Sequence, residues 1–165
     1  MNLSSTGALL IFLMSWDSLE PTDLGLVENG LTGSVNMDDT YTAGRYLLGP
    51  WQSFLRFPAQ QLPIEFSGRE TADAPAVAAR TGRDKSDPDS GGQPVQVSIT
   101  FYYQMQPDDI GRVYQKFALG FHEFYTRFAQ QAISDVVQHF HPSQFWLQRE
   151  TIVKEMEARI NRDIR

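Results

Sequence analysis

The sequence predicts an α+β fold in which short strands come first and packed helices follow. Residues 24–66 consist of short apolar runs separated by glycine and proline, as in strands joined by turns. Residues 95–105 alternate between apolar and polar side chains, and the pattern changes to helical spacing after residue 107. A run of strands followed by a run of helices is typical of helices packed on an antiparallel or mixed sheet.

Composition and charge indicate a globular domain and argue against nucleic-acid binding. The chain has 165 residues, of which 41% are hydrophobic and 21% are charged, so it can bury a sizeable core. It has no cysteine, which excludes disulfides, thiolate metal sites and a cysteine nucleophile. The formal net charge is −6, and residues 1–44 contain acidic residues but no lysine or arginine. Because affinity for nucleic acid depends on positive charge, this balance disfavours such a partner.

The run Leu3–Trp16 is the most apolar part of the sequence. It lacks the basic residues of a signal peptide and the arginines of a mitochondrial presequence. As a helix it would be about 21 Å long, shorter than the ~30 Å hydrocarbon core of a bilayer. A buried core element, a shallow membrane contact or truncated anchor, and a disordered start all remain open. Residues 1–23 are therefore set apart as an apolar segment and candidate membrane contact, with contact residues Leu9, Leu10, Ile11, Phe12 and Trp16.

Residues 24–66 are expected to form short strands joined by tight turns. Asn29-Gly30 is a strong hairpin signal, and Gly49-Pro50 marks a later turn. The stretch Tyr41–Pro58 is rich in aromatic residues and contains two arginines, so it fits packed β-structure, a membrane or partner contact, or a nucleic-acid platform. The charge balance argues against the last of these. The candidates for packing or for membrane or partner contact are Trp51, Phe54 and Phe57.

A polar stretch separates this region from the next strand. Ala76–Thr81 is strand-like, and with residues 95–105 it predicts a hairpin whose tip is an exposed loop at residues 82–92. The loop contains several aspartates, but they lack the spacing and the late glutamate of a calcium-binding loop. We therefore assign no metal site to it.

The C-terminal part of the sequence is predicted to be helical. Pro107 suits the start of a first helix, and Gly120 interrupts it. Residues 121–140 then show helical spacing of apolar residues until His141-Pro142 ends the helix. The last helix, residues 144–165, carries an apolar stripe on an otherwise charged surface. This stripe can face the domain or a partner, and its members are Phe145, Ile152, Met156 and Ile160.

No motif for catalysis is found in the sequence. It has no phosphate-binding loop, no dinucleotide fingerprint and no nucleophile elbow. His139 follows Asp135 by one helical turn, which leaves a hydrolase as a remote alternative. A surface or capping role for His139 is preferred, because the helix dipole favours histidine near a helix C-terminus. We predict that the protein is not an enzyme and assign no catalytic, cofactor-binding or metal-binding residues.

Three passages match one family pattern in order and spacing. The matching residues are Tyr41, Gly44, Gly49, Pro50, Trp51, Phe54, Phe57, Pro58 and Phe66 in the first passage, Arg80, Thr81, Val97, Tyr103 and Pro107 in the second, and Arg149 and Ile152 in the third. Together they resemble the stomatin–prohibitin–flotillin (SPFH, band 7) domain family, and the chain looks prohibitin-like. The resemblance covers residues 24–165, which are set out as one SPFH-like domain.

The resemblance implies both a fold and a function. It implies an antiparallel or mixed sheet of short strands followed by two or three packed helices. Family members commonly continue into a long coiled coil, and we expect no long coiled coil within this sequence, in which it departs from them. It also implies a non-catalytic, membrane-associated scaffold or assembly subunit of a larger complex, in the mitochondrial inner membrane as part of a respiratory-chain complex or prohibitin-like assembly. The implied partners are other membrane-protein subunits, the bilayer surface and other SPFH proteins, as homo- or hetero-oligomers. A soluble adaptor that binds a protein through the last helix is the alternative.

Overall fold

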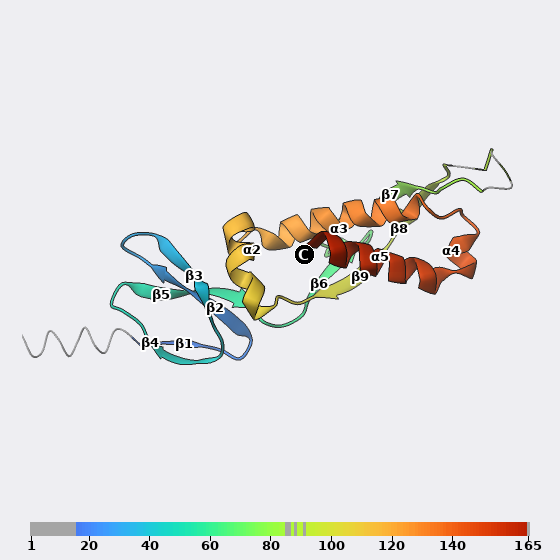
Figure 1. Ribbon diagram of the computed structural model, residues 1–165. Helices are drawn as coiled ribbons and strands as arrows, with labels where there is room; N and C mark the ends of the chain where they lie inside the picture. Colours follow the sequence, from blue (N-terminus) through green and yellow to red (C-terminus); the bar gives the residue numbers. More distant parts are fainter. Residues whose placement is uncertain (1–15, 85–86, 88, 91, 165) are drawn as a thin grey trace, which may run out of the picture. The chain divides into compact units, whose positions relative to one another are not determined.

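A computed structural model describes residues 16–84, 87, 89–90 and 92–164 (Figure 1). The chain folds as two compact units. Four of the predicted contact residues lie outside the described part of the chain: Leu9, Leu10, Ile11 and Phe12.

Each compact unit is built from two separate stretches of the sequence. Of the described residues, those in 16–62 and 103–119 make up the first unit, and those in 63–102 and 120–164 make up the second. The predicted α+β class is confirmed, because every strand precedes every helix along the chain. The described part of the predicted N-terminal segment contains a strand, β1, which pairs within the first unit.

The described residues of the first unit form five short strands and one helical segment. Its sheet has the order β3-β2-β5 with antiparallel pairing, and β1 pairs antiparallel with β4 beside it. The helix α2 packs against β3. The elements are β1 (Trp16–Leu19), β2 (Asp23–Asn29), β3 (Ser34–Tyr41), β4 (Gly44–Leu47), β5 (Gln52–Pro58), the 3-10 helix η1 (Pro107–Asp109) and α2 (Ile110–Phe117).

The predicted Asn29-Gly30 turn is confirmed as the connection between β2 and β3. The Asn29 side chain accepts a hydrogen bond from the backbone N–H of Leu31 at 3.0 Å, as asparagine does in turns. The Gly33 N–H donates to the Asn29 carbonyl at 2.7 Å, and the φ of Gly33 is +67°, a conformation that glycine adopts readily. The turn therefore spans residues 30–33.

The core of the first unit is aromatic and aliphatic. Buried Leu19, Val27, Leu48 and Phe54 form one cluster, against which two tyrosines pack. The rings of Tyr41 and Tyr46 meet edge to face with centroids 5.1 Å apart, an arrangement that aromatic pairs prefer.

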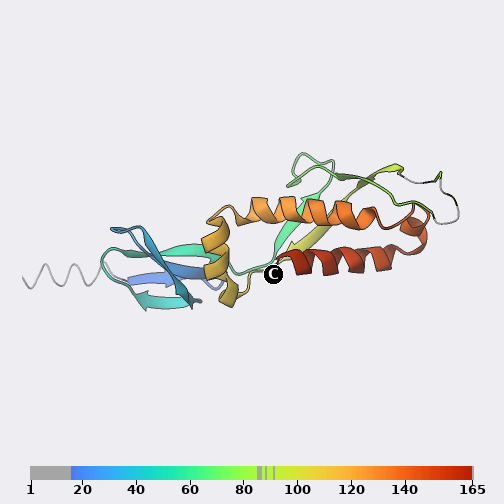
Figure 2. The same ribbon diagram turned by 45° about the horizontal axis from the view of Figure 1, so that its top comes forward.

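In the second unit, the part of the chain that the structure describes forms four short strands and three helices. β7 pairs antiparallel with β8, and β6 lies beside β9. Figure 2 shows α3 and α5 side by side, and the contacts between them agree. The elements are β6 (Leu62–Phe66), β7 (Val77–Arg80), β8 (Pro94–Val97), β9 (Ile99–Tyr103), α3 (Phe121–Val137), α4 (Gln144–Leu147) and α5 (Arg149–Ile164).

The alternation predicted for residues 95–105 is present, although the segment forms two strands rather than one. Every odd-numbered side chain from Val95 to Met105 is buried or half-buried, and every even-numbered one from Gln96 to Gln104 is exposed. The segment changes partner near Ser98, because β8 pairs with β7 whereas β9 pairs with β6. The predicted hairpin with Ala76–Thr81 is therefore the β7–β8 pair.

The predicted breaks at Pro107 and Gly120 are found, α3 ends at Val137 and so before the predicted stop at His141-Pro142, and one further break appears. Pro107 begins η1, and Gly120 lies at the N-terminal cap of α3. The last helix was expected to run from residue 144 without a break, but Gln148 has φ −127° and ψ 35° and separates α4 from α5. Periodicity does not reveal this break, because residues on both sides of Gln148 are compatible with a helix.

Candidate functional site

Two large apolar side chains lie exposed at the open end of the β1–β4 pair. Trp16 begins β1 and Leu47 ends β4, and the two residues are direct partners in the antiparallel register. Direct partners project to the same face of an antiparallel pair, so their side chains are neighbours. The exposed fractions are 57% for Trp16 and 54% for Leu47.

Two more exposed apolar side chains come from the adjacent turns. The Gly30 N–H donates to the carbonyl of Trp51 at 2.7 Å, which brings the β2–β3 turn against the connection between β4 and β5. Leu31 lies in that turn and is 68% exposed, and Trp51 is 60% exposed.

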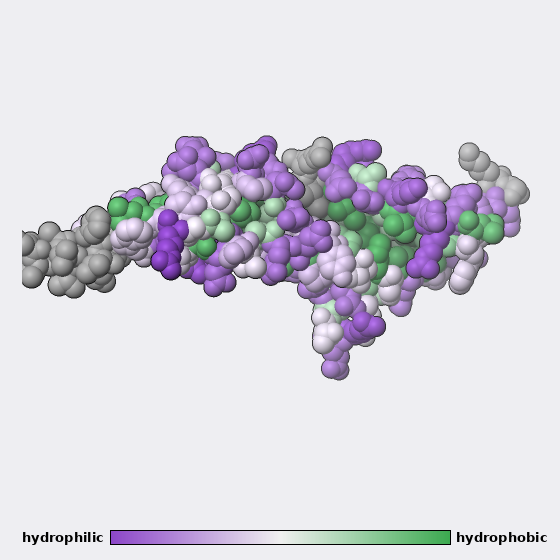
Figure 3. All heavy atoms as spheres, turned by 90° about the horizontal axis from the view of Figure 1, so that it is seen from below, coloured by the Kyte–Doolittle hydropathy of each residue, from purple (hydrophilic) through white to green (hydrophobic). Residues whose placement is uncertain are grey.

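These four side chains belong to the same end of the first unit. Only residues 48–51 separate the end of β4 from the start of β5. Leu47 and Gln52 also line one shallow cavity of about 380 Å³ with Asn29, the last residue of β2. In Figure 3 apolar residues are visible on the first unit among hydrophilic ones. We call Trp16, Leu31, Leu47 and Trp51 the apolar end.

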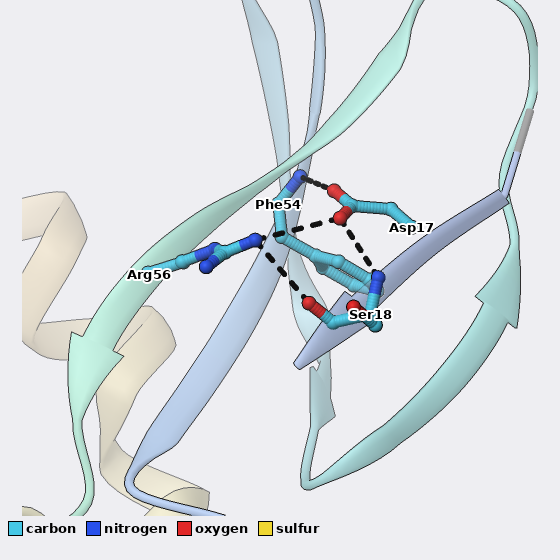
Figure 4. A network of polar contacts seen from close by, with 4 residues as sticks. All are labelled: Asp17, Ser18, Phe54 and Arg56. Atoms are coloured by element: carbon cyan, nitrogen blue, oxygen red, sulfur yellow. Dashed lines mark hydrogen bonds and ion pairs between the residues drawn. The ribbon is translucent and has the colours of Figure 1, made fainter. Parts of the chain in front are cut away.

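A polar network holds β1 in place beside β5 (Figure 4). The Asp17 carboxylate accepts a hydrogen bond from the backbone N–H of Phe54 at 3.4 Å and lies 3.5 Å from Nη2 of Arg56. The same Nη2 donates to the carbonyl of Ser18 at 3.2 Å. The ion pair is partly exposed, so its own contribution is at most about 1 kcal/mol. The network positions the start of β1, and therefore Trp16.

The sequence matches the model of one protein family, described as the SPFH domain / Band 7 family, over residues 18–165. The match covers most of the chain. The protein belongs to the SPFH/band 7 family. A comparison with curated proteins finds no match. Members of the SPFH family are generally membrane-associated, non-catalytic scaffolds that form oligomers.

The aromatic residues of the first SPFH passage divide between surface and core. Trp51 is exposed, whereas Phe54 and Phe57 are buried, with exposed fractions of 9% and 1%. Phe57 also packs edge to face against Tyr114 of α2, with ring centroids 6.2 Å apart. Alternation along β5 explains the burial of Phe54 but not of Phe57, which lies on the opposite face and is covered by α2.

Sequence reasoning did not identify Leu31 or Leu47 as members of the apolar end. Leu31 follows a turn signal, and Leu47 lies in a run that reads as an ordinary strand. The signal that relates them to the tryptophans is the strand register, which pairs Trp16 with Leu47 and Asn29 with Gln52. A single sequence does not show that register.

The predicted stripe of the last helix is used within the SPFH domain itself. Ile152, Met156 and Ile160 are buried, and α5 contacts α3. Phe145 lies in α4 and is half-buried, with its ring 6.5 Å from that of Phe140. The exposed apolar residues nearby are instead Trp146 and Leu147, at 88% and 81%.

The structure also places the residues considered for chemistry. Asp135 forms an ion pair with Arg159 of α5 at 3.7 Å, and His139 is exposed beyond the end of α3. Among the described residues, no group of three or more histidine, aspartate or glutamate side chains is arranged to hold a metal ion. In the same part of the chain, no helix combines the length and apolar character needed to cross a bilayer.

Proposed function

We propose that this SPFH protein is a non-catalytic assembly subunit of a membrane-protein complex, held at the bilayer surface through the apolar end of its first unit. The observation that supports the proposal is the gathering of Trp16, Leu31, Leu47 and Trp51 at one end of that unit. Exposed apolar patches mark sites of contact with membranes or proteins. Tryptophan favours the membrane–water interface, where its ring is buried and its N–H reaches water.

The strength of this contact can be estimated from its area. Complete burial of a large apolar side chain contributes about 1.5–3 kcal/mol, and side chains that the fold already half covers contribute roughly 1 kcal/mol each. The four residues together would give roughly 4 kcal/mol, comparable to the weak and reversible membrane binding of a single lipid chain. A stable anchor therefore needs a second element, and we propose that the part of the N-terminal segment that precedes β1, including Leu9, Leu10, Ile11 and Phe12, supplies it.

The charge of the protein indicates which kind of membrane contact to expect. The net charge is −6, and the residues up to position 44 contain no lysine or arginine. Attraction to anionic lipids requires clusters of basic residues, so the contact is expected to be apolar and only weakly sensitive to salt.

The proposal extends to partners and location. We place the protein beside other membrane-protein subunits and other SPFH chains, in the mitochondrial inner membrane. This location rests on the family resemblance, and fractionation of mitochondria tests it. Co-purification from detergent-solubilised membranes, with the mass of the native complex, tests the assembly role.

Flotation of the full chain with vesicles of neutral phospholipid tests the membrane contact. Wild-type protein is expected to float, and a variant with Leu31→Ser and Trp51→Ser is expected to float several-fold less. A matched control replaces Trp146 and Leu147 with serine, two exposed apolar residues of the second unit, and is expected to float as the wild type does. Deletion of residues 3–15 tests the second element.

Two outcomes would contradict the membrane proposal. In the first, a variant that combines Leu31→Ser, Trp51→Ser and the deletion of residues 3–15 floats as well as the wild type does. In the second, the wild-type chain does not float, which would favour a soluble adaptor that binds a protein partner.

A further inference from the structure

A groove in the second unit lies between the β7–β8 hairpin and α3. Its volume is about 1150 Å³. The strands contribute Ala78–Arg80 and Pro94–Gln96, α3 contributes Ser134, and Gln138 lies at the C-terminal cap of α3. We propose that this groove, here called the hairpin groove, binds an extended, carboxylate-bearing segment of a partner protein. This inference goes beyond the membrane contact of the first unit and does not depend on it.

The shape of the groove follows from a close approach of backbone to backbone. The Gly82 N–H donates to the carbonyl of Phe140 at 2.8 Å. A Cβ atom on Gly82 would overlap the carbonyl oxygen of Gln138, so only glycine lets the hairpin come this near to the end of α3. The approach fixes one end of the groove, and the small side chains of Ala78 and Ala79 leave space along it.

The charge of the groove is opposite to that of the whole chain. Arg80 and Arg83 line it, and no carboxylate does so among the described residues. The protein as a whole carries −6. One guanidinium nitrogen of Arg80 donates to the Gly92 carbonyl at 3.3 Å, which holds the side chain at the hairpin. A guanidinium has five N–H donors, so Arg80 can keep this bond and also bind a carboxylate.

The dimensions and the polar groups favour a peptide over a small molecule. Pockets for small molecules usually measure about 300–1,000 Å³ and are largely enclosed, whereas this groove is larger and open. Both strands line the groove at partnered positions, Ala78 with Gln96 and Arg80 with Pro94, so an extended occupant would lie along the hairpin. Gln96, Ser134 and Gln138 supply side-chain donors and acceptors for a peptide backbone.

Fluorescence anisotropy with the full chain tests the proposal. The probe is a labelled peptide of alternating glutamate and valine, about ten residues long, and the matched probe has glutamine in place of glutamate. Wild-type protein is expected to bind the glutamate peptide saturably and the glutamine peptide at least about tenfold more weakly, since bonds to charged groups are the stronger ones.

Variants distinguish the groove from general electrostatic attraction. Arg80→Gln with Arg83→Gln is expected to weaken binding at least about tenfold. The control, Arg69→Gln with Arg127→Gln, removes the same charge from exposed arginines of the same unit and is expected to leave binding unchanged. Ser134→Leu keeps the charge and fills the groove, and it is expected to weaken binding. This variant retains Arg80, so it tests the groove independently if the replacement of Arg80 disturbs the hairpin.

Four results would overturn the inference. One is the absence of saturable binding of the glutamate peptide to the wild-type chain. Another is an equal loss in the control pair, which would show that net charge alone attracts the peptide. The third is undiminished binding to Ser134→Leu. Capture of anionic phospholipid vesicles through Arg80 and Arg83, without binding of the peptide, would likewise assign the groove to lipid and reject a protein segment.

Discussion

Trp16 lies directly across the β1–β4 pair from Leu47, and both side chains are more than half exposed. Thirty residues of sequence separate the two, and antiparallel register brings them together as one apolar surface. Trp51 belongs to the same end, whereas Trp146 lies in the second unit. This difference makes the three tryptophans of the chain useful reporters.

Tryptophan fluorescence is expected to distinguish the apolar end from the second unit. Three variants each keep one tryptophan and carry phenylalanine at the other two positions. On addition of neutral vesicles, emission from Trp16 and from Trp51 is expected to shift to the blue, because their rings leave water for the interface. Emission from Trp146 is the internal control and is expected to stay unchanged. A blue shift confined to Trp146 would place the membrane contact on the second unit and contradict the proposal.

Gly111→Ala is expected to destabilise the protein, although alanine is the better helix former. Gly111 is the second residue of α2, where propensity alone predicts a gain of about 1 kcal/mol. A Cβ atom there would overlap the backbone carbonyl oxygen of Met37, so α2 must move away from β3. We expect a net loss of about 1–3 kcal/mol in the free energy of unfolding, measured by urea denaturation.

A second glycine supplies the control for that measurement. Gly68 has open space where its Cβ would be, so Gly68→Ala is expected to change the free energy of unfolding by less than about 1 kcal/mol. Equal effects of the two substitutions would mean that backbone entropy, rather than the contact with Met37, determines the result.

Ala118→Gly is expected to stabilise the protein. Ala118 has φ 50° and ψ −128°, a conformation that costs a residue with a Cβ about 1–3 kcal/mol. Glycine removes this strain but gains entropy in the unfolded chain, which offsets about 0.4–1 kcal/mol. The midpoint of thermal unfolding is expected to rise by a few degrees. Ala78→Gly, in β7, has no such strain to relieve and is expected to lower the midpoint of thermal unfolding. A lower midpoint for Ala118→Gly would contradict the argument.

Asp73 is expected to contribute stability that is lost in acid. A hydrogen bond from the backbone N–H of Glu65, at 2.9 Å, is the main reason that the pKa of Asp73 lies below its usual value of 3.8, and the contact with His122 lowers the pKa further. Asp73 therefore binds a proton more readily in the unfolded chain than in the folded one. Stability decreases as the pH falls from the usual pKa of 3.8 towards the lower pKa of the folded state.

The variant Asp73→Asn keeps an acceptor for Glu65 but cannot ionise. It is expected to be less stable than the wild type near neutral pH, and this difference should shrink as the pH falls below about 4. Urea unfolding at a series of pH values measures it. A difference that is constant from neutral to acid pH would show that the carboxylate charge plays no part.

Much of the fold could be predicted because it follows from local pattern. The alternation of Val95–Met105, the Asn29-Gly30 turn and the interruption at Gly120 depend on neighbours in sequence, and all three are present. The break at Gln148 and the change of strand partner near Ser98 were missed. The change of strand partner depends on where distant segments pair, and neither feature is visible in the local periodicity.

The candidate site divides in the same way. Trp16 could be selected because tryptophan at the end of an apolar run is typical of a membrane interface, and Trp51 because it lies in an aromatic-rich stretch, although the sequence did not separate it from Phe54 and Phe57. Leu31 and Leu47 could not, since leucine is most often a core residue and a single leucine in a strand or turn carries no signal of exposure. Only the antiparallel register places both beside the tryptophans.

For this protein, sequence alone determined the α+β class, the order of strands and helices, and the spaced residues that relate the chain to the SPFH family. Periodicity, turn chemistry and composition act over a few residues, so they can be recognised without coordinates. Tertiary structure decided that Phe54 and Phe57 are core whereas Trp51 is surface, and that Gly82 and Gly111 allow close approach. Those outcomes depend on which segments meet across long separations in sequence, and excluded volume between backbones is a property of the folded chain.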